Sequence, residues 1–192
     1  DKDFEQILPS IKTSSLKYIY FADSYGSLLP SEIPKFIDIL RPTGKLIGFH
    51  PHNNMQLGFS NSLAAIEHGV DMVDGTVFGM GRGAGNMPLE TMIAYCQKSV
   101  NKKKYNVIPI LQLINRYFLK LVKDHPWGYD LPYMISGVYG VHPNYAKSLT
   151  DGGNYGIEDI SAVLKIINRM NLTGFNKDII IQIIQSGFIR SR

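Results

Sequence analysis

The chain has 192 residues, of which 44% are hydrophobic, and it carries a formal net charge of +4. This length and apolar content are sufficient for a buried core and predict a globular protein. The basic residues are scattered apart from the run Lys102–Lys104, which we interpret as a solvated loop, so we predict no nucleic-acid contact. No apolar run is long enough for a membrane span, and the first residues do not resemble a signal peptide. A single cysteine leaves no internal disulfide, so we expect a cytoplasmic protein without membrane contact.

Three stretches share one pattern, in which a short apolar run rich in β-formers is followed by a polar loop and a helix-period segment. They cover residues 16–42, 45–69 and 71–99. Their starts recur about every 25 to 30 residues, which is typical of βα units. The sequence therefore predicts an α/β fold with a parallel sheet and helices packed outside it.

From about residue 90 onward the strand pattern fades. Segments 107–125, 157–171 and 177–188 have mostly helical periodicity, although the last is sufficiently β-branched to leave a strand as an alternative. We predict a helical C-terminal domain over residues 101–192, after an α/β part over residues 1–100. Three βα units do not close a (β/α)8 barrel of about 250 residues. The sheet is therefore open, or the chain is the later part of a barrel.

Polar residues follow each predicted strand, at the edge where the functional groups of parallel α/β proteins gather. They are Asp23, Ser24 and Gly26 after the first strand, His50, His52, Asn53 and Asn54 after the second, and Asp74, Gly75 and Thr76 at the third. Side chains at positions i and i+2 of a strand share a face, so His50 and His52 can ligate one divalent ion. An ordinary polar loop is the alternative interpretation of this pair.

The glycine-rich segment 79–86 leads into a predicted helix. Its glycines permit positive φ, and a helix N-terminus favours an anion, so both anion binding and a purely structural turn are compatible with it. As a dinucleotide-binding motif it is weak, because no later strand ends in the expected acidic residue. Asn86 is either a helix cap or a further oxygen ligand.

A catalytic nucleophile is hard to identify. Cys96 lies within a predicted helix, where a buried, inert thiol is the simpler interpretation. Tyr139 belongs to the segment "GVYGVHPNY" at residues 137–145 and is a candidate proton-transfer group, with a core position as the alternative.

The motifs "FADSYG", "GFHPHNN", "NSLAAIEHG" and "VDGTVFGMGRGAGNMPLE" together resemble the second half of the HMG-CoA-lyase-like family of metal-dependent (β/α)8-barrel enzymes. The resemblance is strong over residues 17–99 and looser over residues 130–147. The 4-hydroxy-2-oxovalerate aldolase branch is the most similar, through "GMGRGAGNMPLE" and "SGVYGVHPNYA". This implies that the chain holds the last three βα units of a barrel followed by a helical region.

The resemblance also implies roles for individual residues. His50 and His52 would be metal ligands, with His50 also beside the bound oxo acid, and Asn86 would be a ligand of second rank. Ser24 would bind the substrate carboxylate, and Tyr139 would contact the substrate and assist proton transfer. The implied cofactor is Mn²⁺ or Mg²⁺, although Co²⁺ and Zn²⁺ also fit imidazole and oxygen ligands.

The implied activity is cleavage of a 4-hydroxy-2-oxo acid to pyruvate and an aldehyde. Two alternatives are a Claisen-type acyltransferase that uses acetyl-CoA, like isopropylmalate or homocitrate synthase, and a non-catalytic, barrel-derived assembly module. The family's first-strand Arg-Asp pair and the histidine base that follows it have no counterpart here, so we expect the chain alone to be inactive and to belong to a longer protein. The catalytic-cysteine loop of HMG-CoA lyase is also missing. The implied partners are a small 2-oxo acid and either further copies of the chain or an aldehyde dehydrogenase.

Overall fold

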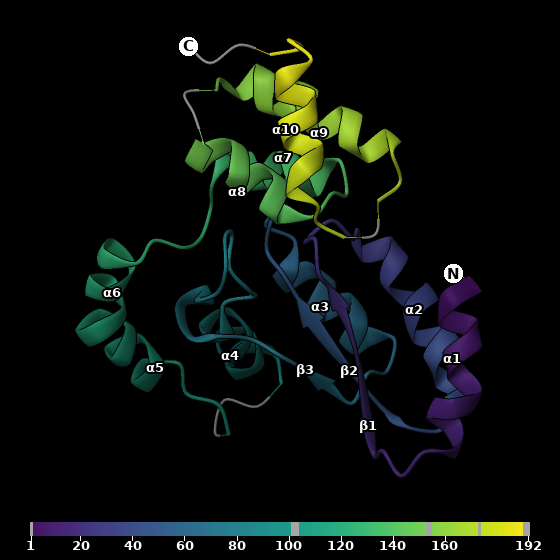
Figure 1. Ribbon diagram of the computed structural model, residues 1–192. Coiled ribbons are helices and arrows are strands. Elements are labelled where there is room, and N and C mark those ends of the chain that lie inside the picture. The colour runs from purple at the N-terminus through teal and green to yellow at the C-terminus, as the bar shows by residue number, and fades with distance from the viewer. Residues whose placement is uncertain (1, 101–103, 153–154, 173, 190–192) are drawn as a thin grey trace.

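The computed structural model describes residues 2–100, 104–152, 155–172 and 174–189 (Figure 1). Two lysines of the predicted solvated loop, Lys102 and Lys103, lie outside these described residues. Within the described ranges, no helix is both long and apolar enough to cross a membrane.

Three parallel strands form one sheet in the order β1-β2-β3, namely β1 (Tyr18–Asp23), β2 (Leu46–Pro51) and β3 (Met72–Val73). Strand β1 pairs with β2 from Tyr18↔Leu46 to Asp23↔Pro51. A helix follows each strand, with α2 (Ile33–Leu40) after β1, α3 (Gly58–Glu67) after β2 and α4 (Leu89–Ser99) after β3. The predicted α/β class and parallel sheet are confirmed.

Short 3₁₀ turns flank these units, at Pro30–Glu32, Arg41–Thr43 and Val77–Gly79. An additional helix, α1 (Lys2–Thr13), precedes the first strand and was not anticipated from the sequence. Its partly buried Leu8 and Ile11 pack against the core under the sheet.

One face of the sheet is covered by helices α1, α2 and α3 (Figure 1). Side chains of a strand alternate between its two faces, and in β1 the buried positions are Ile19, Phe21 and Asp23. The core of this part consists of Ile19, Phe21, Ile33, Ile37, Leu40, Ile47, Phe49 and Ala65. Strand alternation thus determines which residues meet the helices.

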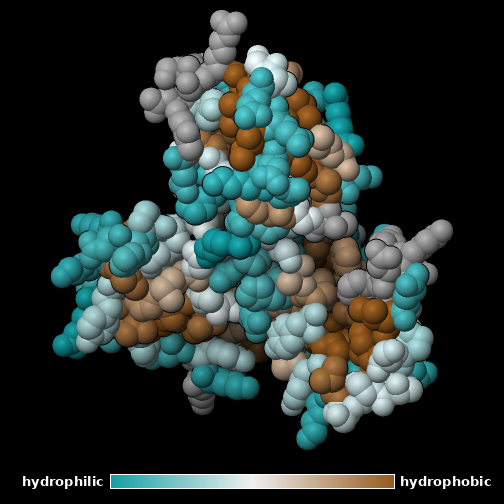
Figure 2. Space-filling model, viewed as in Figure 1, coloured by the Kyte–Doolittle hydropathy of each residue, from teal (hydrophilic) through white to brown (hydrophobic). Residues whose placement is uncertain are grey.

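The opposite face of the sheet is open among the described residues. Tyr18, Tyr20 and Leu46 are 51%, 45% and 43% exposed there, although their neighbours along the strands are buried. On the face drawn in Figure 2, hydrophobic residues also gather over the β1–α1 side and over the α5–α6 segment. An uncovered apolar sheet face of this kind is characteristic of a surface that packs against further structure.

The C-terminal region is helical, as predicted. Its elements are α5 (Ile108–Leu113), a π-helical turn (Ile114–Phe118), α6 (Leu119–Asp124), α7 (Leu131–Val138), α8 (Pro143–Gly152), α9 (Ile157–Arg169) and α10 (Lys177–Gln185). The strand alternative for residues 177–188 is wrong, because α10 begins with an Asn176 cap whose side chain accepts the N–H of Asp178 at 2.9 Å.

Helices α7 to α10 enclose a second hydrophobic core and lie beyond the carboxyl ends of β1 and β2 (Figure 1). Its largest fully buried side chains include Tyr145, Leu149, Leu164 and Ile167. The division at residue 100 stays a prediction, although each side of it has a core of its own. The packing places α7 directly over the strand ends, where the candidate site lies.

Candidate metal and substrate site

The end of strand β2 brings two histidines onto one face. His50 is the penultimate residue of β2 and His52 follows it by two positions, so the alternation of the strand directs both side chains to the same side. Their ring centroids are 5.1 Å apart, with the rings at 80° to each other. The sequence-based expectation that these imidazoles are neighbours is therefore confirmed as geometry.

Burial lowers the pKa of His52 to about 4, with smaller contributions from the positive charges of His50 and Arg82. His52 is consequently neutral at pH 7. A neutral imidazole presents a free nitrogen lone pair, which is the form that binds a metal ion.

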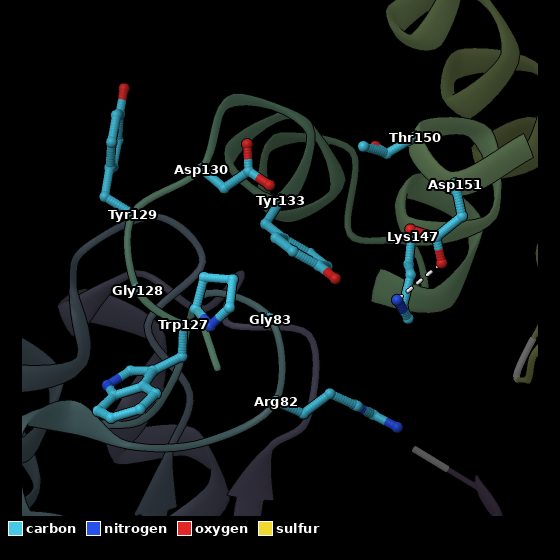
Figure 3. A pocket seen from close by; sticks show the side chains of 11 residues that line it. Arg82, Gly83, Trp127, Gly128, Tyr129, Asp130, Tyr133, Lys147, Thr150 and Asp151 are labelled. Carbon is cyan, nitrogen blue, oxygen red and sulfur yellow. Dashed lines mark hydrogen bonds and ion pairs between the residues drawn. The ribbon is translucent and has the colours of Figure 1, made fainter. Parts of the chain in front are cut away.

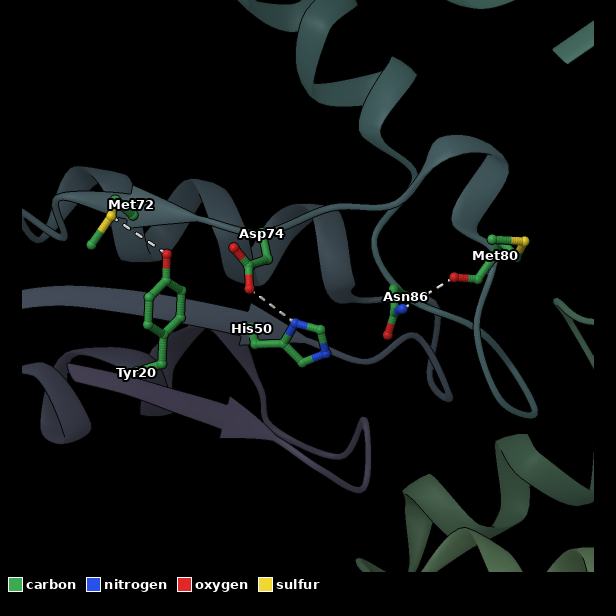
Figure 4. Close-up of polar contacts among 6 residues, drawn as sticks. All are labelled: Tyr20, His50, Met72, Asp74, Met80 and Asn86. Carbon is green, nitrogen blue, oxygen red and sulfur yellow. Dashed lines mark hydrogen bonds and ion pairs between the residues drawn. The ribbon is translucent and has the colours of Figure 1, made fainter. Parts of the chain in front are cut away.

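His50 is held by Asp74, which directly follows strand β3. Its Nδ1 lies 3.3 Å from Oδ2 of Asp74 (Figure 4). If Nδ1 carries the ring proton and donates a hydrogen bond to this carboxylate, Nε2 keeps its lone pair. This is the usual arrangement of a metal-binding histidine. The sequence placed Asp74 at the correct strand end but assigned it no role, because nothing in a single sequence pairs it with His50.

The glycine-rich loop brings Asn86 beside His52. Gly79, Gly83 and Gly85 have φ values of 61°, 62° and 77°, a region that favours glycine. A Cβ on Gly85 would lie 2.2 Å from the carbonyl oxygen of Gly79, so only glycine fits. This compact loop allows Asn86 to form an isolated antiparallel bridge with His52.

Asn86 has an unsatisfied side-chain oxygen. Its Nδ2 donates to the carbonyl of Met80 at 3.2 Å, whereas Oδ1 is buried and has no hydrogen-bond partner among the described residues (Figure 4). Buried acceptors without a partner are rare in proteins, and coordination of a metal ion would satisfy this oxygen. Two imidazoles and an amide oxygen are a donor set that suits a divalent ion.

The donor set lacks a carboxylate that would complete it. Within the part of the chain that the structure describes, no group of three or more His, Cys, Asp or Glu side chains is placed to hold a metal ion. His50, His52 and Asn86 therefore fit a metal ion only as part of a larger ligand set.

The loop after β1 is shaped by a buried carboxylate. Asp23 is 3% exposed and accepts the backbone N–H groups of Ser27 at 3.0 Å and Leu28 at 3.1 Å. Burial raises the pKa of Asp23, and these hydrogen bonds oppose the shift. Ser24 is exposed directly after the Asp23↔Pro51 pair, beside the strand end that carries the histidines. Its position suits contact with a ligand bound there.

Tyr139, by contrast, lies within the helical region. Its hydroxyl is 3.0 Å from Oγ of Ser161 in α9, its carbonyl accepts Nδ2 of Asn168 at 2.6 Å, and its ring packs on the C-terminal core. The structure does not bring its phenol to the histidine pair. From the same segment His142 reaches the β1 loop instead, with its ring centroid 5.7 Å from that of Tyr25.

A cleft of about 910 Å³ runs along the open edge of β1 and is lined by Ser24, Tyr25 and His142. Helix α7 closes over the neighbouring loop, because Nδ2 of the buried Asn54 donates to Oγ of Ser136 at 3.0 Å. The helical region thus adds residues to the strand ends, and only the folded chain shows which ones.

Comparison with known proteins places this geometry in context. The family model described as HMGL-like matches residues 2–116. The chain is 36% identical over 130 residues to a 4-hydroxy-2-oxovalerate aldolase of Stutzerimonas stutzeri, covering 66% of this chain and 37% of that protein. It is 34% identical over 169 residues to 4-hydroxy-2-oxovalerate aldolase 3 of Burkholderia lata, covering 84% of this chain and 47% of that protein. The chain thus spans less than half the length of these relatives.

Two solved structures have a similar fold. The N-terminal domain of a proposed aldolase of Bacteroides vulgatus is 31% identical, with a TM-score of 0.69, over 82% of this chain and 50% of that one. The carboxyl transferase domain of Rhizobium etli pyruvate carboxylase, solved with pyruvate and biocytin, is 18% identical, with a TM-score of 0.59, over 85% of this chain and 28% of that one. The latter likeness shows the fold alone.

Proposed function

Since the chain belongs to the HMGL-like family, we propose that it is the later part of a (β/α)8 barrel that cleaves a 4-hydroxy-2-oxo acid to pyruvate and an aldehyde. The observation that carries the proposal is the grouping of His50, His52 and the unpartnered Oδ1 of Asn86 at the carboxyl ends of parallel strands. The aldolase names of the relatives support the reaction class.

In this proposal the ion is Mn²⁺ or Mg²⁺, and His50, His52 and Asn86 hold it. When bound, it supplies a Lewis acid to the 2-oxo acid. The neutral imidazole of His52 suits this role, and Asp74 keeps the ring of His50 in place.

Other residues of the chain bind the substrate. The exposed hydroxyl of Ser24 donates to the substrate carboxylate, and His50 lies beside the oxo acid. In the cleavage a base from the remaining part of the barrel takes the proton of the 4-hydroxyl, whose oxygen becomes the aldehyde carbonyl. The C3–C4 bond breaks, its electron pair passes to C3, and a proton delivered to C3 gives pyruvate. We propose that Tyr139 assists this proton transfer, because its segment resembles that of the aldolase branch. To act there, its hydroxyl must exchange the contact with Ser161 for one with the substrate.

The open sheet face supports the partial-barrel proposal. In a closed barrel the face that carries Tyr18, Tyr20 and Leu46 points to the interior, which is filled by side chains from all eight strands. The remaining strands would also supply the carboxylate ligand that the described residues lack. We therefore propose that the complete cytoplasmic protein is active and that this chain alone is not.

The decisive experiment is an assay of pyruvate release from a panel of 4-hydroxy-2-oxo acids by the complete protein, with and without Mn²⁺. Metal-dependent release is expected. His50→Ala should abolish tight Mn²⁺ binding in calorimetry, whereas the matched control His142→Ala should not. Unchanged Mn²⁺ affinity in His50→Ala would end the metal assignment. Tyr139→Phe should lower turnover far more than it weakens metal binding.

A non-catalytic module is the second candidate, and the incomplete ligand set of the described residues favours it. Absence of pyruvate release from an intact, metal-loaded protein would support it. Release of free CoA from acetyl-CoA and a 2-oxo acid would indicate the acyltransferase alternative instead. Self-association or an aldehyde dehydrogenase partner would become visible as a larger particle in sedimentation.

A further inference from the structure

A separate cavity of about 360 Å³ lies where the glycine-rich loop meets the C-terminal helices, and the reaction proposed above does not use it. Arg82 and Gly83 line it from the loop, Trp127 from the α6–α7 connection, and Tyr133 and Lys147 from helices α7 and α8 (Figure 3). The volume suits a small molecule.

Arg82 is an exposed cation in this cavity. Among the described residues its guanidinium makes no hydrogen bond or ion pair, yet its charge contributes to lowering the pKa values of His52 and His142. Arginine presents a planar fork of N–H donors that matches the two oxygens of a carboxylate or phosphate. The side chain is therefore available to an incoming oxyanion.

Two further donors face the same space. Nζ of Lys147 bonds Oδ2 of Asp151 at 2.7 Å, which leaves other N–H groups of the ammonium free to donate. The ring of Tyr133 packs against Gly83, so that a Cβ added to Gly83 would lie 2.8 Å from it. The phenol of Tyr133 points toward Lys147 (Figure 3). Asp130 lies on the far rim, away from Arg82 (Figure 3). The end of the cavity near Arg82 is thus rich in donors.

We propose that this cavity binds a small molecule through an oxyanion group, a phosphate or a carboxylate, that Arg82 and Lys147 hold together. The hydroxyl of Tyr133 donates to the same group, and Trp127 forms the wall beside the rest of the molecule. Binding here requires neither a metal ion nor catalysis, so the proposal stands or fails separately from the aldolase assignment.

Trp127 supplies a built-in reporter. It is the only tryptophan among the 192 residues, it lines the cavity, and its Nε1 donates to the carbonyl of Phe78 at 2.9 Å. The full chain is titrated with inorganic phosphate and, separately, with succinate, at an ionic strength held constant with chloride. Calorimetry and Trp127 fluorescence are recorded together. We expect saturable binding of at least one anion.

Arg82→Gln should weaken that binding by about tenfold or more, because the charged fork is lost. Lys147→Gln should weaken it less, since Asp151 already shares that charge. Arg169→Gln, which removes an exposed arginine outside the cavity, should leave the affinity unchanged. If far-UV circular dichroism shows that Arg82→Gln is unfolded, the anion affinity of Lys147→Gln is compared with that of the parent chain instead.

The two titrants identify the source of the oxyanion. Binding of phosphate alone indicates a phosphorylated ligand, binding of succinate alone indicates a carboxylic acid, and binding of both indicates selection by charge. The proposal is overturned if neither anion gives a saturable response beyond the chloride control. It is equally overturned if the folded arginine and lysine variants bind as tightly as the parent chain.

Discussion

Replacing Asp74 by Asn tests whether this carboxylate positions His50. The substitution keeps the shape of the side chain but removes its charge and one acceptor oxygen. Loss of a carboxylate behind a metal-binding histidine typically lowers metal affinity by about 10- to 100-fold. Here the Nδ1–Oδ2 distance is 3.3 Å, and the His50 and Asp74 side chains are 30% and 47% exposed. Because the contact is long and partly solvated, we expect the lower end, about tenfold, or about 1.4 kcal/mol.

The assay is calorimetric titration of the complete protein with Mn²⁺. Asp38→Asn is the matched control, because Asp38 is an exposed carboxylate that lies 3.9 Å from Arg41 in a long surface pair, away from the histidines. It removes the same charge away from the site and should leave the affinity unchanged. An Asp74→Asn protein with an affinity within about twofold of the parent, or an equal loss in Asp38→Asn, would refute the positioning role.

Three further outcomes are expected. Gly85→Ala should destabilise the protein more than Gly44→Ala. Both glycines have positive φ, but of the two only a Cβ at position 85 would meet another atom, the carbonyl oxygen of Gly79 at 2.2 Å. Equal free energies of unfolding in denaturant titrations would contradict this. Ser136→Ala should lower the free energy of unfolding by about 1 kcal/mol in the same assay, because Nδ2 of the buried Asn54 loses its 3.0 Å acceptor and keeps the 3.4 Å contact with the carbonyl of Tyr133. An unchanged free energy of unfolding would show that the amide finds another partner. Burial raises the pKa of Asp23 above its unfolded value, so between these two pKa values the folded state binds more protons, and the contribution of Asp23 to stability falls as pH rises. The lowered pKa of His52 acts in the opposite direction in both proteins, so the free energy of unfolding of the parent minus that of Asp23→Asn should fall from pH 4 to pH 7. A difference that stays constant would contradict this.

The sequence by itself determined the order and type of most elements. Alternating and helical periodicities are local properties, so they located the three βα units and the helical segments at 107–125, 157–171 and 177–188. Helices α7 and α8 were not located individually. The two-residue spacing in "HPH" likewise fixed the shared face of His50 and His52, because a strand has a period of two. Helix α1 was missed, and β3 is only two residues long.

The tertiary structure decided which distant residues meet. Asp74 contacts His50 across 24 positions, and Ser136 contacts Asn54 across 82. No local pattern encodes such a contact, because it depends on how helices and strands pack. For the same reason the segment at 137–145 was judged by its residue types, whereas packing turned Tyr139 toward the hydroxyl of Ser161. The sequence determined most elements of this protein, and the packing between them decided which side chains form the site.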